Sequence, residues 1–185
     1  MPTIMTHPVP LIAAAAAFGN HVISTRLLIA GIFFAILPDV DAISFKLGIP
    51  YESIFGHRGL SHSIAMVAIA FLIGLLFAPL LKARRMIAAL VLSGAVLTHI
   101  ALDAMTSGGL GVAFFWPFDN TRHFVDFRPI RVSPISMKAF LTDRGIAVLK
   151  SELLWVWLPC ISMGLFGFCI RHFLIKKDPF ANWKP

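Results

Sequence analysis

Histidine and aspartate, the residue types that bind metal ions and transfer protons, occur in four short clusters within the first 103 residues. These four polar clusters are Thr6-His7, Pro38-Asp39-Val40-Asp41, His57-Arg58-Gly59-Leu60-Ser61-His62-Ser63, and His99 with Asp103. Each cluster lies at one end of an apolar segment. Ionisable side chains at the edge of hydrocarbon are costly, so they usually mark a functional site there. If the four segment ends meet, these side chains form one site.

The spacing of His99 and Asp103 suits a shared ligand. They are four positions apart, so on a helix both project from one face and can bind one ion. A single histidine hydrogen-bonded to its neighbouring aspartate is the alternative.

The second histidine pair, His57 and His62, can share a site if the chain turns between them. The spacing of five is poor on a continuous helix, but it works if Gly59 marks a turn and the helix begins near Ser61, a suitable N-cap. The alternative is a capped helix with two interfacial histidines.

The carboxylates Asp39 and Asp41 follow Pro38 at a predicted helix end. A capping turn would explain one of them. Two carboxylates at a helix C-terminus oppose the helix dipole, and a bound cation or an arginine would offset that penalty.

Together, the polar clusters hold too many nitrogen and oxygen donors for one ion, and they suit two or three zinc-like ions. The predicted metal ligands are His7, Asp39, His57, His62, His99 and Asp103. Asp41 and Arg58 are predicted to take catalytic roles. His21, His123 and His172 lack a patterned partner and are predicted to be ordinary residues.

The composition belongs to a membrane protein. Hydrophobic residues make up 58% of the 185 residues and charged residues 14%, against roughly 25% in soluble domains. The net charge of +7 would suggest nucleic acid in a soluble protein. Here cations that flank apolar segments indicate membrane topology and contact with anionic lipid, so the lipid bilayer is the predicted partner and nucleic acid is not.

Five apolar segments predict an all-α, polytopic membrane helical bundle with four to five membrane helices. The segments are 8–23, 26–37, 60–81, 86–105 and 153–175. The second is too short for a crossing of about 20 residues, so the first two are predicted to form a partly buried hairpin. No lysine or arginine precedes the first segment, which predicts a retained helix rather than a cleaved signal.

The whole chain, residues 1–185, is predicted to be one membrane-embedded domain. It comprises a metal-site core at 5–130, a long polar and aromatic section at 106–151, and a terminal membrane helix at 153–175. Successive crossings put all four polar clusters on one side of the membrane. The opposite side receives Arg26, the turn from Lys82 to Arg85, and Lys176-Lys177. Because short cytoplasmic loops are rich in Lys and Arg, the site is predicted to face the periplasm.

At these motifs the chain resembles the YdjM-like family of bacterial inner-membrane, metal-dependent hydrolases, some of them under SOS control. The run from His57 to Ser63 is the most specific motif, and Trp116-Pro117-Phe118 extends the likeness over about residues 5 to 130. The resemblance implies a multi-pass protein of the bacterial inner membrane with hydrolase activity.

That family is distantly similar to zinc-dependent phospholipase C, an all-helical fold with a three-zinc site and a His-x-x-x-Asp ligand pair. The likeness implies that His99 and Asp103 are ligands. It also implies ligand positions for His7, Asp39 and His62. The His-x-x-x-Glu pair of that fold is absent here, because the only glutamates are Glu52 and Glu152.

The leading functional hypothesis is a membrane-bound metal hydrolase that uses metal-activated water on a phosphoester or lipid-linked substrate. Arg58 and Arg122 are predicted to bind the substrate phosphate, a task suited to the planar guanidinium group, and Arg128 and Arg131 are weaker candidates. A divalent-metal transporter is disfavoured because the polar residues crowd one face. A non-catalytic metal-binding membrane protein is the third hypothesis. The sequence predicts no protein partner.

Overall fold

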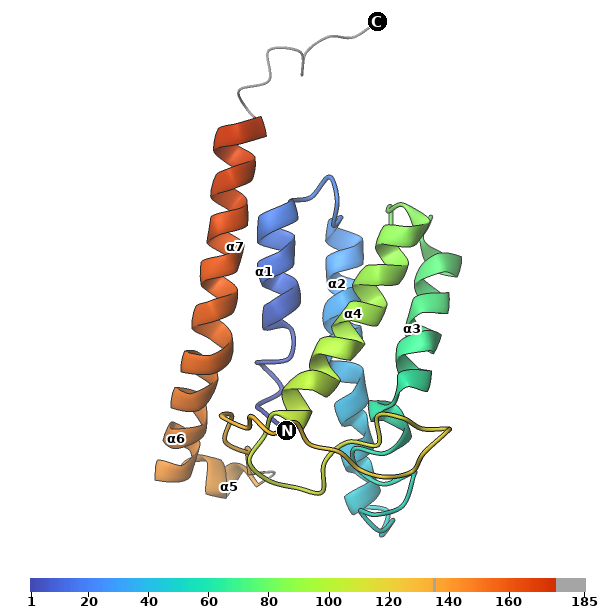
Figure 1. Cartoon of the computed structure of the whole chain (residues 1–185), viewed down its shortest axis with the longest axis vertical. Coiled ribbons are helices and arrows are strands. Elements are labelled where there is room, and N and C mark those ends of the chain that lie inside the picture. Colours follow the sequence, from blue (N-terminus) through green and yellow to red (C-terminus); the bar gives the residue numbers. More distant parts are fainter. Residues whose placement is uncertain (135, 176–185) are drawn as a thin grey trace, which may run out of the picture.

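The chain forms a bundle of antiparallel helices with one longer helix along its side (Figure 1). The computed structural model describes residues 1–134 and 136–175, and these contain no strand, so the prediction of an all-α fold is confirmed. The α-helices are α1 (Val9–Phe18), α2 (Thr25–Ile36), α3 (Ile64–Phe77), α4 (Arg85–Ala104), α5 (Met137–Phe140), α6 (Asp143–Glu152) and α7 (Leu158–Ile170). Two 3-10 helices are present, η1 (Leu37–Phe45) and η2 (Leu60–His62). Two segments are π-helical, η3 (Leu153–Trp157) and η4 (Arg171–Ile175).

Three helical stretches in the described chain are long and apolar enough to cross a membrane, which takes about 20 residues. They are Thr25–Phe45 with 21 residues, Arg85–Ala104 with 20, and Asp143–Phe173 with 31. The apolar helices α1 and α3 are shorter, at 10 and 14 residues. The structure is therefore a helical membrane bundle with both full-length and shorter apolar helices.

The second apolar segment runs further than the sequence suggested. It was expected to stop at Pro38, but the helix continues beyond this residue as η1 and ends at Phe45. Pro38 lies in the first turn of η1, where its missing N–H removes no helical hydrogen bond. The prediction of a twelve-residue segment was therefore wrong, and α2 with η1 has the length of a full crossing.

Two other helix starts also differ from expectation. The polar section predicted to reach residue 151 ends at Thr142, whose hydroxyl oxygen accepts a hydrogen bond from the backbone N–H of Arg144 and caps α6. From there α6, η3 and α7 form one continuous helix. Ser61 does not cap α3, because the helix begins after Ser63 and the Ser61 hydroxyl donates to Asp41 instead.

Helix α4 lies at the centre of the bundle and packs against α2 and α3. Small residues allow the close approach: a Cβ atom at Gly74 of α3 would overlap the backbone of Ala89 in α4. Leu92, Val96 and Ile100 of α4 are almost fully buried in the core. The C-terminal part of α4 therefore brings its polar side chains into the interior.

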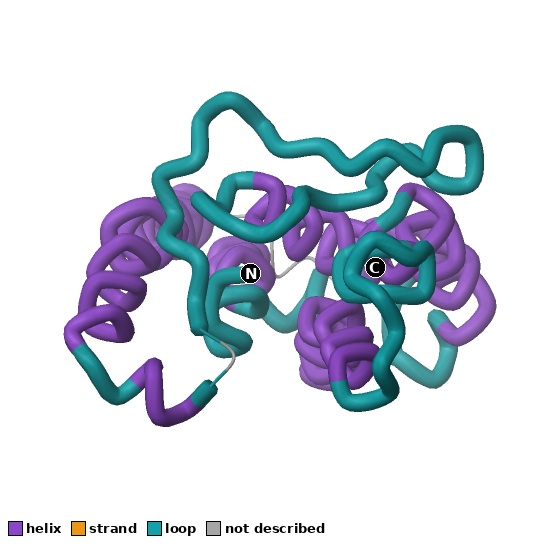
Figure 2. The backbone as a smooth tube through the Cα atoms, turned by 90° about the horizontal axis from the view of Figure 1, so that it is seen from below, coloured by secondary structure: helices purple, strands orange, loops and turns teal. Residues whose placement is uncertain are grey.

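All four polar clusters lie at the same end of the bundle, the lower end in Figure 1. There α1 and α3 begin, and α2 and α4 end. Loop segments cross this end, as the view from below shows (Figure 2). Arg26 and the turn before α4 lie at the opposite end, while Lys176-Lys177 lies outside the described residues.

Candidate metal centre

Helix α4 supplies His99 and Asp103, both of which are completely buried. They lie one turn apart on one helix face, as their spacing predicts. Nδ1 of His99 lies 2.7 Å from the carbonyl oxygen of Ala35, so this nitrogen carries the proton and donates it. The other ring nitrogen, Nε2, is left with its lone pair directed toward the site, which is the usual arrangement of a metal-binding histidine.

A tight turn after α2 and η1 brings in His62. Arg58 has a φ of 62°, and a Cβ atom at Gly59 would overlap the carbonyl of Ile54, so the turn requires glycine at this position. The ring of His62 then points inward, with Nε2 lying 3.0 Å from Nε2 of His99 and 3.2 Å from Oδ2 of Asp103.

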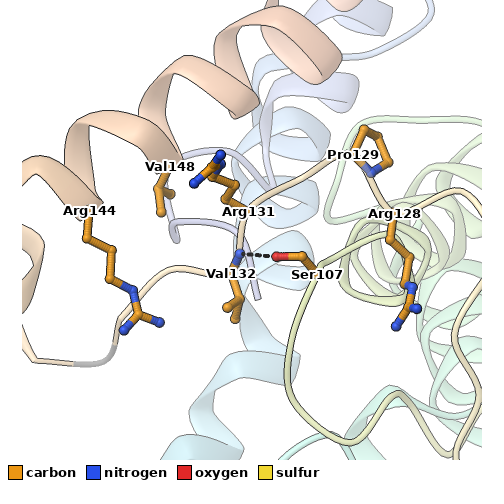
Figure 3. A pocket seen from close by; sticks show the side chains of 7 residues that line it. All are labelled: Ser107, Arg128, Pro129, Arg131, Val132, Arg144 and Val148. Carbon is orange, nitrogen blue, oxygen red and sulfur yellow. Dashed lines mark hydrogen bonds between the residues drawn. The ribbon is translucent and has the colours of Figure 1, made fainter.

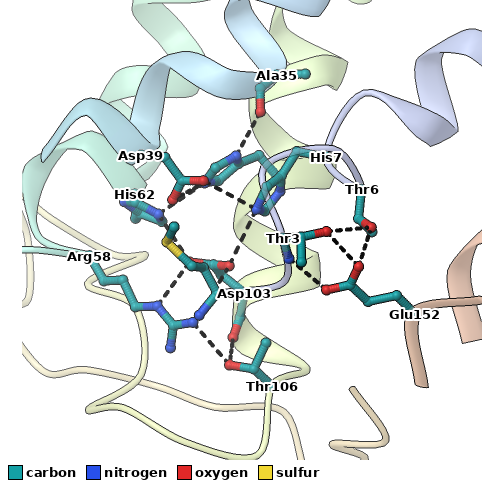
Figure 4. A network of polar contacts seen from close by, with 12 residues as sticks. Thr3, Thr6, His7, Ala35, Asp39, Arg58, His62, Asp103, Thr106 and Glu152 are labelled. Atoms are coloured by element: carbon teal, nitrogen blue, oxygen red, sulfur yellow. Dashed lines mark hydrogen bonds and ion pairs between the residues drawn. The ribbon is translucent and has the colours of Figure 1, made fainter. Parts of the chain in front are cut away.

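Asp39 completes a group of four buried residues, which we call the metal cluster: Asp39, His62, His99 and Asp103 (Figure 4). One potential ligand atom from each residue lies within 4.8 Å of the other three. Asp103 is paired with Arg58, whose Nε lies 2.8 Å from Oδ2, but both oxygens of Asp39 lack a hydrogen bond from the described residues and have only His7 and His99 nearby, at 3.4 and 3.6 Å. Buried carboxylates are costly without compensation, and imidazole and carboxylate are ligands of the zinc class. The metal cluster could therefore hold a divalent ion.

His7 approaches this cluster from the segment before α1. Its ring stacks on His99 with centroids 3.7 Å apart, and its Nε2 lies 3.4 Å from Asp39 and 3.7 Å from Asp103. Burial lowers the pKa of His7 to about 4, so its imidazole is neutral, the form that binds metal. His7 is thus placed to serve as an additional donor.

The pKa of His62 is shifted in the opposite direction from that of His7. Burial alone lowers its pKa, but hydrogen bonds to Asp103 and Asp41 outweigh burial and raise the pKa to about 9. Without metal, the protonated ring supplies the positive charge between these two carboxylates. A metal ion that binds at Nε2 takes over that charge and displaces the proton.

Arg58 is completely buried beside the metal cluster. Its Nε lies 2.8 Å from Oδ2 of Asp103, and its two terminal nitrogens donate to Oγ1 of Thr106 at 3.0 Å and to the carbonyl of Gly108 at 3.1 Å. Arg58, His57 and Tyr51 are among the residues that line a pocket of about 400 Å³, which we call the central pocket. None of the four residues of the metal cluster lines this pocket, but Arg58 both lines it and pairs with Asp103 of the cluster.

Asp41, which was predicted to be catalytic, is occupied by its neighbours. One of its oxygens lies 2.5 Å from Nδ1 of His57, and the other accepts from the Arg58 backbone N–H at 2.9 Å, from Ser61 and from Nδ1 of His62. These contacts orient the two histidines. His57 itself, predicted to be a metal ligand, is not among the four residues of the metal cluster and lines the central pocket instead.

Arg122, predicted to bind substrate, holds the loop between η1 and η2. Its guanidinium group donates to the carbonyl oxygens of His57 at 2.8 Å, Tyr51 at 2.7 Å and Ser53 at 3.0 Å. Its hydrogen-bonding capacity is therefore largely used within the chain. The three histidines predicted to be ordinary lie outside the metal cluster; His123 pairs with the exposed Asp119 at 3.7 Å.

Sequence reasoning missed the buried Glu152. Its carboxylate accepts hydrogen bonds of 2.6 Å from the hydroxyls of Thr3 and Thr6 and from the Thr3 backbone N–H (Figure 4). The indole of Trp157 also donates to Thr6, at 2.8 Å. The residue after Thr6 is His7, so the terminal helix holds the segment that presents this histidine. The only signal in the sequence was an acidic residue directly before an apolar run.

Comparison with known proteins identifies a family of inner membrane proteins. The model of the YdjM inner membrane protein family matches residues 1–175. The inner membrane protein YbcI of Escherichia coli (strain K12) is 41% identical over 172 residues, which cover 89% of this chain and 96% of YbcI. No solved structure matches the chain. The likeness thus extends through the terminal helix, and the chain belongs to the YdjM inner membrane protein family.

Proposed function

We propose that this protein is a membrane-embedded, metal-dependent hydrolase that acts on a phosphoester or lipid-linked substrate. The observation that supports this proposal is the metal cluster, in which two buried carboxylates and two buried histidines each place a potential ligand atom within 4.8 Å of the others. A divalent ion held there would supply Lewis acidity toward water and a phosphoryl oxygen. Asp39, His62, His99 and Asp103 would bind the first ion. His7, whose Nε2 lies 3.4 Å from Asp39 and 3.7 Å from Asp103, would add a further donor, so that a second zinc-like ion could share the site.

The residues of the central pocket suggest how the chain would assist hydrolysis. Asp41 fixes Nδ1 of His57, and His57 lines the pocket, so His57 is placed to transfer a proton to or from a bound substrate. Arg58 lines the same pocket while its Nε pairs with Asp103. It would orient a substrate phosphate with the part of its planar group that faces the pocket.

We further propose that the site faces the periplasm. The end of the bundle opposite the site carries the short basic turn with Lys82, Arg84 and Arg85, and such turns remain in the cytoplasm. The proposed substrates are then those that reach the outer side of the inner membrane.

The proposal is tested on detergent-purified protein by measuring its metal content with plasma mass spectrometry and its hydrolysis of bis(p-nitrophenyl) phosphate. We expect near-stoichiometric metal and metal-dependent turnover in the wild type, with both lost in His62→Ala. The matched control is His21→Ala, because His21 is exposed and lies far from the cluster in the sequence. This control should retain both properties.

Other outcomes distinguish the remaining hypotheses. Bound metal without turnover of this diester or of a short-chain phospholipid would identify a structural metal site. Zinc flux into proteoliposomes, lost in His62→Ala, would identify a transporter. Absence of bound zinc, iron, manganese or a similar ion would overturn the proposal.

A further inference from the structure

A second pocket, of about 380 Å³, adjoins the central pocket and is rich in arginine (Figure 3). The side chains of Arg128 and Arg144 extend from opposite sides of it, and Arg131 extends from the segment between them. We call it the arginine pocket. Arg144 and Val132 line both pockets, so the two are contiguous.

The charges of the arginine pocket are not compensated within the described part of the chain. No carboxylate there lies within 4.0 Å of the three guanidinium groups, and none of these groups donates a hydrogen bond to a described residue. Arg128 only stacks on Phe124, 4.8 Å from the ring centroid. Arg58 and Arg122, by contrast, use their donors on protein acceptors. All three arginines are exposed, and three cations without a protein partner around one pocket attract an anion.

The position of the pocket along the terminal helix indicates where that ligand lies. The stretch Asp143–Phe173 has 31 residues, about 46 Å at 1.5 Å per residue, which exceeds the roughly 30 Å of hydrocarbon. Large apolar side chains are exposed at intervals from Leu153 to Phe173 and suit contact with lipid tails. The preceding turns, which carry Arg144 and Val148, therefore stand at the level of the lipid headgroups.

We propose that Arg128, Arg131 and Arg144 form a phosphate-binding pocket whose occupant in the membrane is the headgroup of an anionic phospholipid. Planar guanidinium groups match phosphate oxygens, and each cation near an anionic membrane surface favours binding. The pocket is separate from the metal cluster, so this inference does not depend on hydrolase activity. If the protein is a hydrolase, a lipid phosphate held in the arginine pocket would lie beside the central pocket, which Arg58 lines.

The test is lipid retention measured by native mass spectrometry, with the protein purified in neutral detergent and exposed to equal amounts of phosphatidylglycerol and phosphatidylcholine. We expect the wild type to retain phosphatidylglycerol preferentially. The triple variant Arg128→Gln, Arg131→Gln and Arg144→Gln should lose that preference by about tenfold or more. A matched control removes the same charge at the other end of the bundle, where Arg26, Arg84 and Arg85 are exposed and are each replaced by Gln.

Each outcome decides the inference. An equal loss in the control triple, or a wild type that shows neither lipid preference nor stabilisation by inorganic phosphate, would overturn it. Stabilisation of lipid-stripped wild type by inorganic phosphate, without phosphatidylglycerol retention, would keep the phosphate pocket but reject the lipid as its occupant. The lipid preference should also persist after chelator treatment. Loss of metal or turnover alone would count against the hydrolase and leave the pocket standing.

Discussion

Asp41 is the carboxylate that contacts both His57 and His62, the two histidines of the motif from His57 to Ser63. It lies 2.5 Å from Nδ1 of His57 and 3.1 Å from Nδ1 of His62, and its side chain is only 10% exposed. Carboxylates that accept from a ligating histidine fix the tautomer and raise the basicity of the metal-binding nitrogen. Asp41 therefore orients both imidazoles, and it is not among the four residues that could hold a metal ion.

Replacing Asp41 by Asn should lower metal affinity by about 10- to 100-fold, because the amide cannot accept from every donor that the carboxylate serves. Competition with a chromogenic chelator measures this change. The control is Asp119→Asn, whose carboxylate is 50% exposed and pairs with His123 away from the cluster. Equal affinity of the two variants would mean that Asp41 does not support the site.

Arg58 combines complete burial with three donor contacts, and a lysine cannot reproduce them. Lysine would keep the charge near Asp103 but would leave either Thr106 or the Gly108 carbonyl without its charged donor. We expect Arg58→Lys to cost about 1–3 kcal/mol, observed as a lower midpoint of thermal unfolding in detergent. Arg85→Lys, at an exposed position, should leave the midpoint unchanged. An unchanged midpoint for Arg58→Lys would show that the three separate donor contacts of the guanidinium group do not contribute to stability.

At the scale of elements, the terminal helix stabilises the site without contributing to the metal cluster. It packs along α1, where a Cβ atom at Gly167 would press on Ala17, and its buried Glu152 holds Thr3 and Thr6. These contacts fix the segment that leads to His7. The helix therefore positions one side of the site from a part of the sequence that is about 150 residues away.

Glu152→Gln should lower metal content while the protein remains folded in the membrane. Glutamine offers one oxygen where two threonine hydroxyls and one backbone N–H now find acceptors, so a buried donor would lose its partner. His7 would then be less firmly placed. Glu52→Gln is the matched control, because Glu52 is the other glutamate and is exposed. Similar metal content in both variants would mean that the Glu152 network has no effect on the site.

The elements also show what the sequence could and could not predict. Apolar length predicted the helices, and the spacing of His99 and Asp103 predicted one shared face, because both are local properties of a chain. The second apolar segment was predicted to stop at Pro38, but the helix continues from α2 into η1, since proline is tolerated in the first turn of the continuing helix.

Side-chain partners across long separations could not be predicted. The contacts of Asp41 with its histidines depend on the turn at Arg58 and Gly59, and that turn is set by packing against Ile54. Glu152 meets Thr3 only because two helices pack side by side. No local pattern in the amino-acid sequence indicates that Asp41 contacts these histidines or that Glu152 contacts Thr3.

At the scale of the whole molecule, the two ends of the bundle differ in kind. The site end carries the metal cluster, the central and arginine pockets, and the loops that cross it (Figure 2). The other end has the short turn between α3 and α4 with its basic residues. A tight basic turn between two apolar helices is the stronger topological signal, because long sections with mixed charge translocate largely regardless of their cations.

The topology can be decided with one cysteine at each end. In a background where Cys160 and Cys169 are replaced by Ala, Ala83→Cys keeps every charge of the basic turn, and Phe55→Cys marks the site end, where Phe55 is 69% exposed. With a membrane-impermeant maleimide in intact cells, we expect labelling at residue 55 and protection at residue 83 until the cells are opened. The reverse pattern would place the site in the cytoplasm. The metal cluster would be unaffected, since its geometry depends on helix packing, but the candidate substrates would be those of the inner leaflet and the cytoplasm.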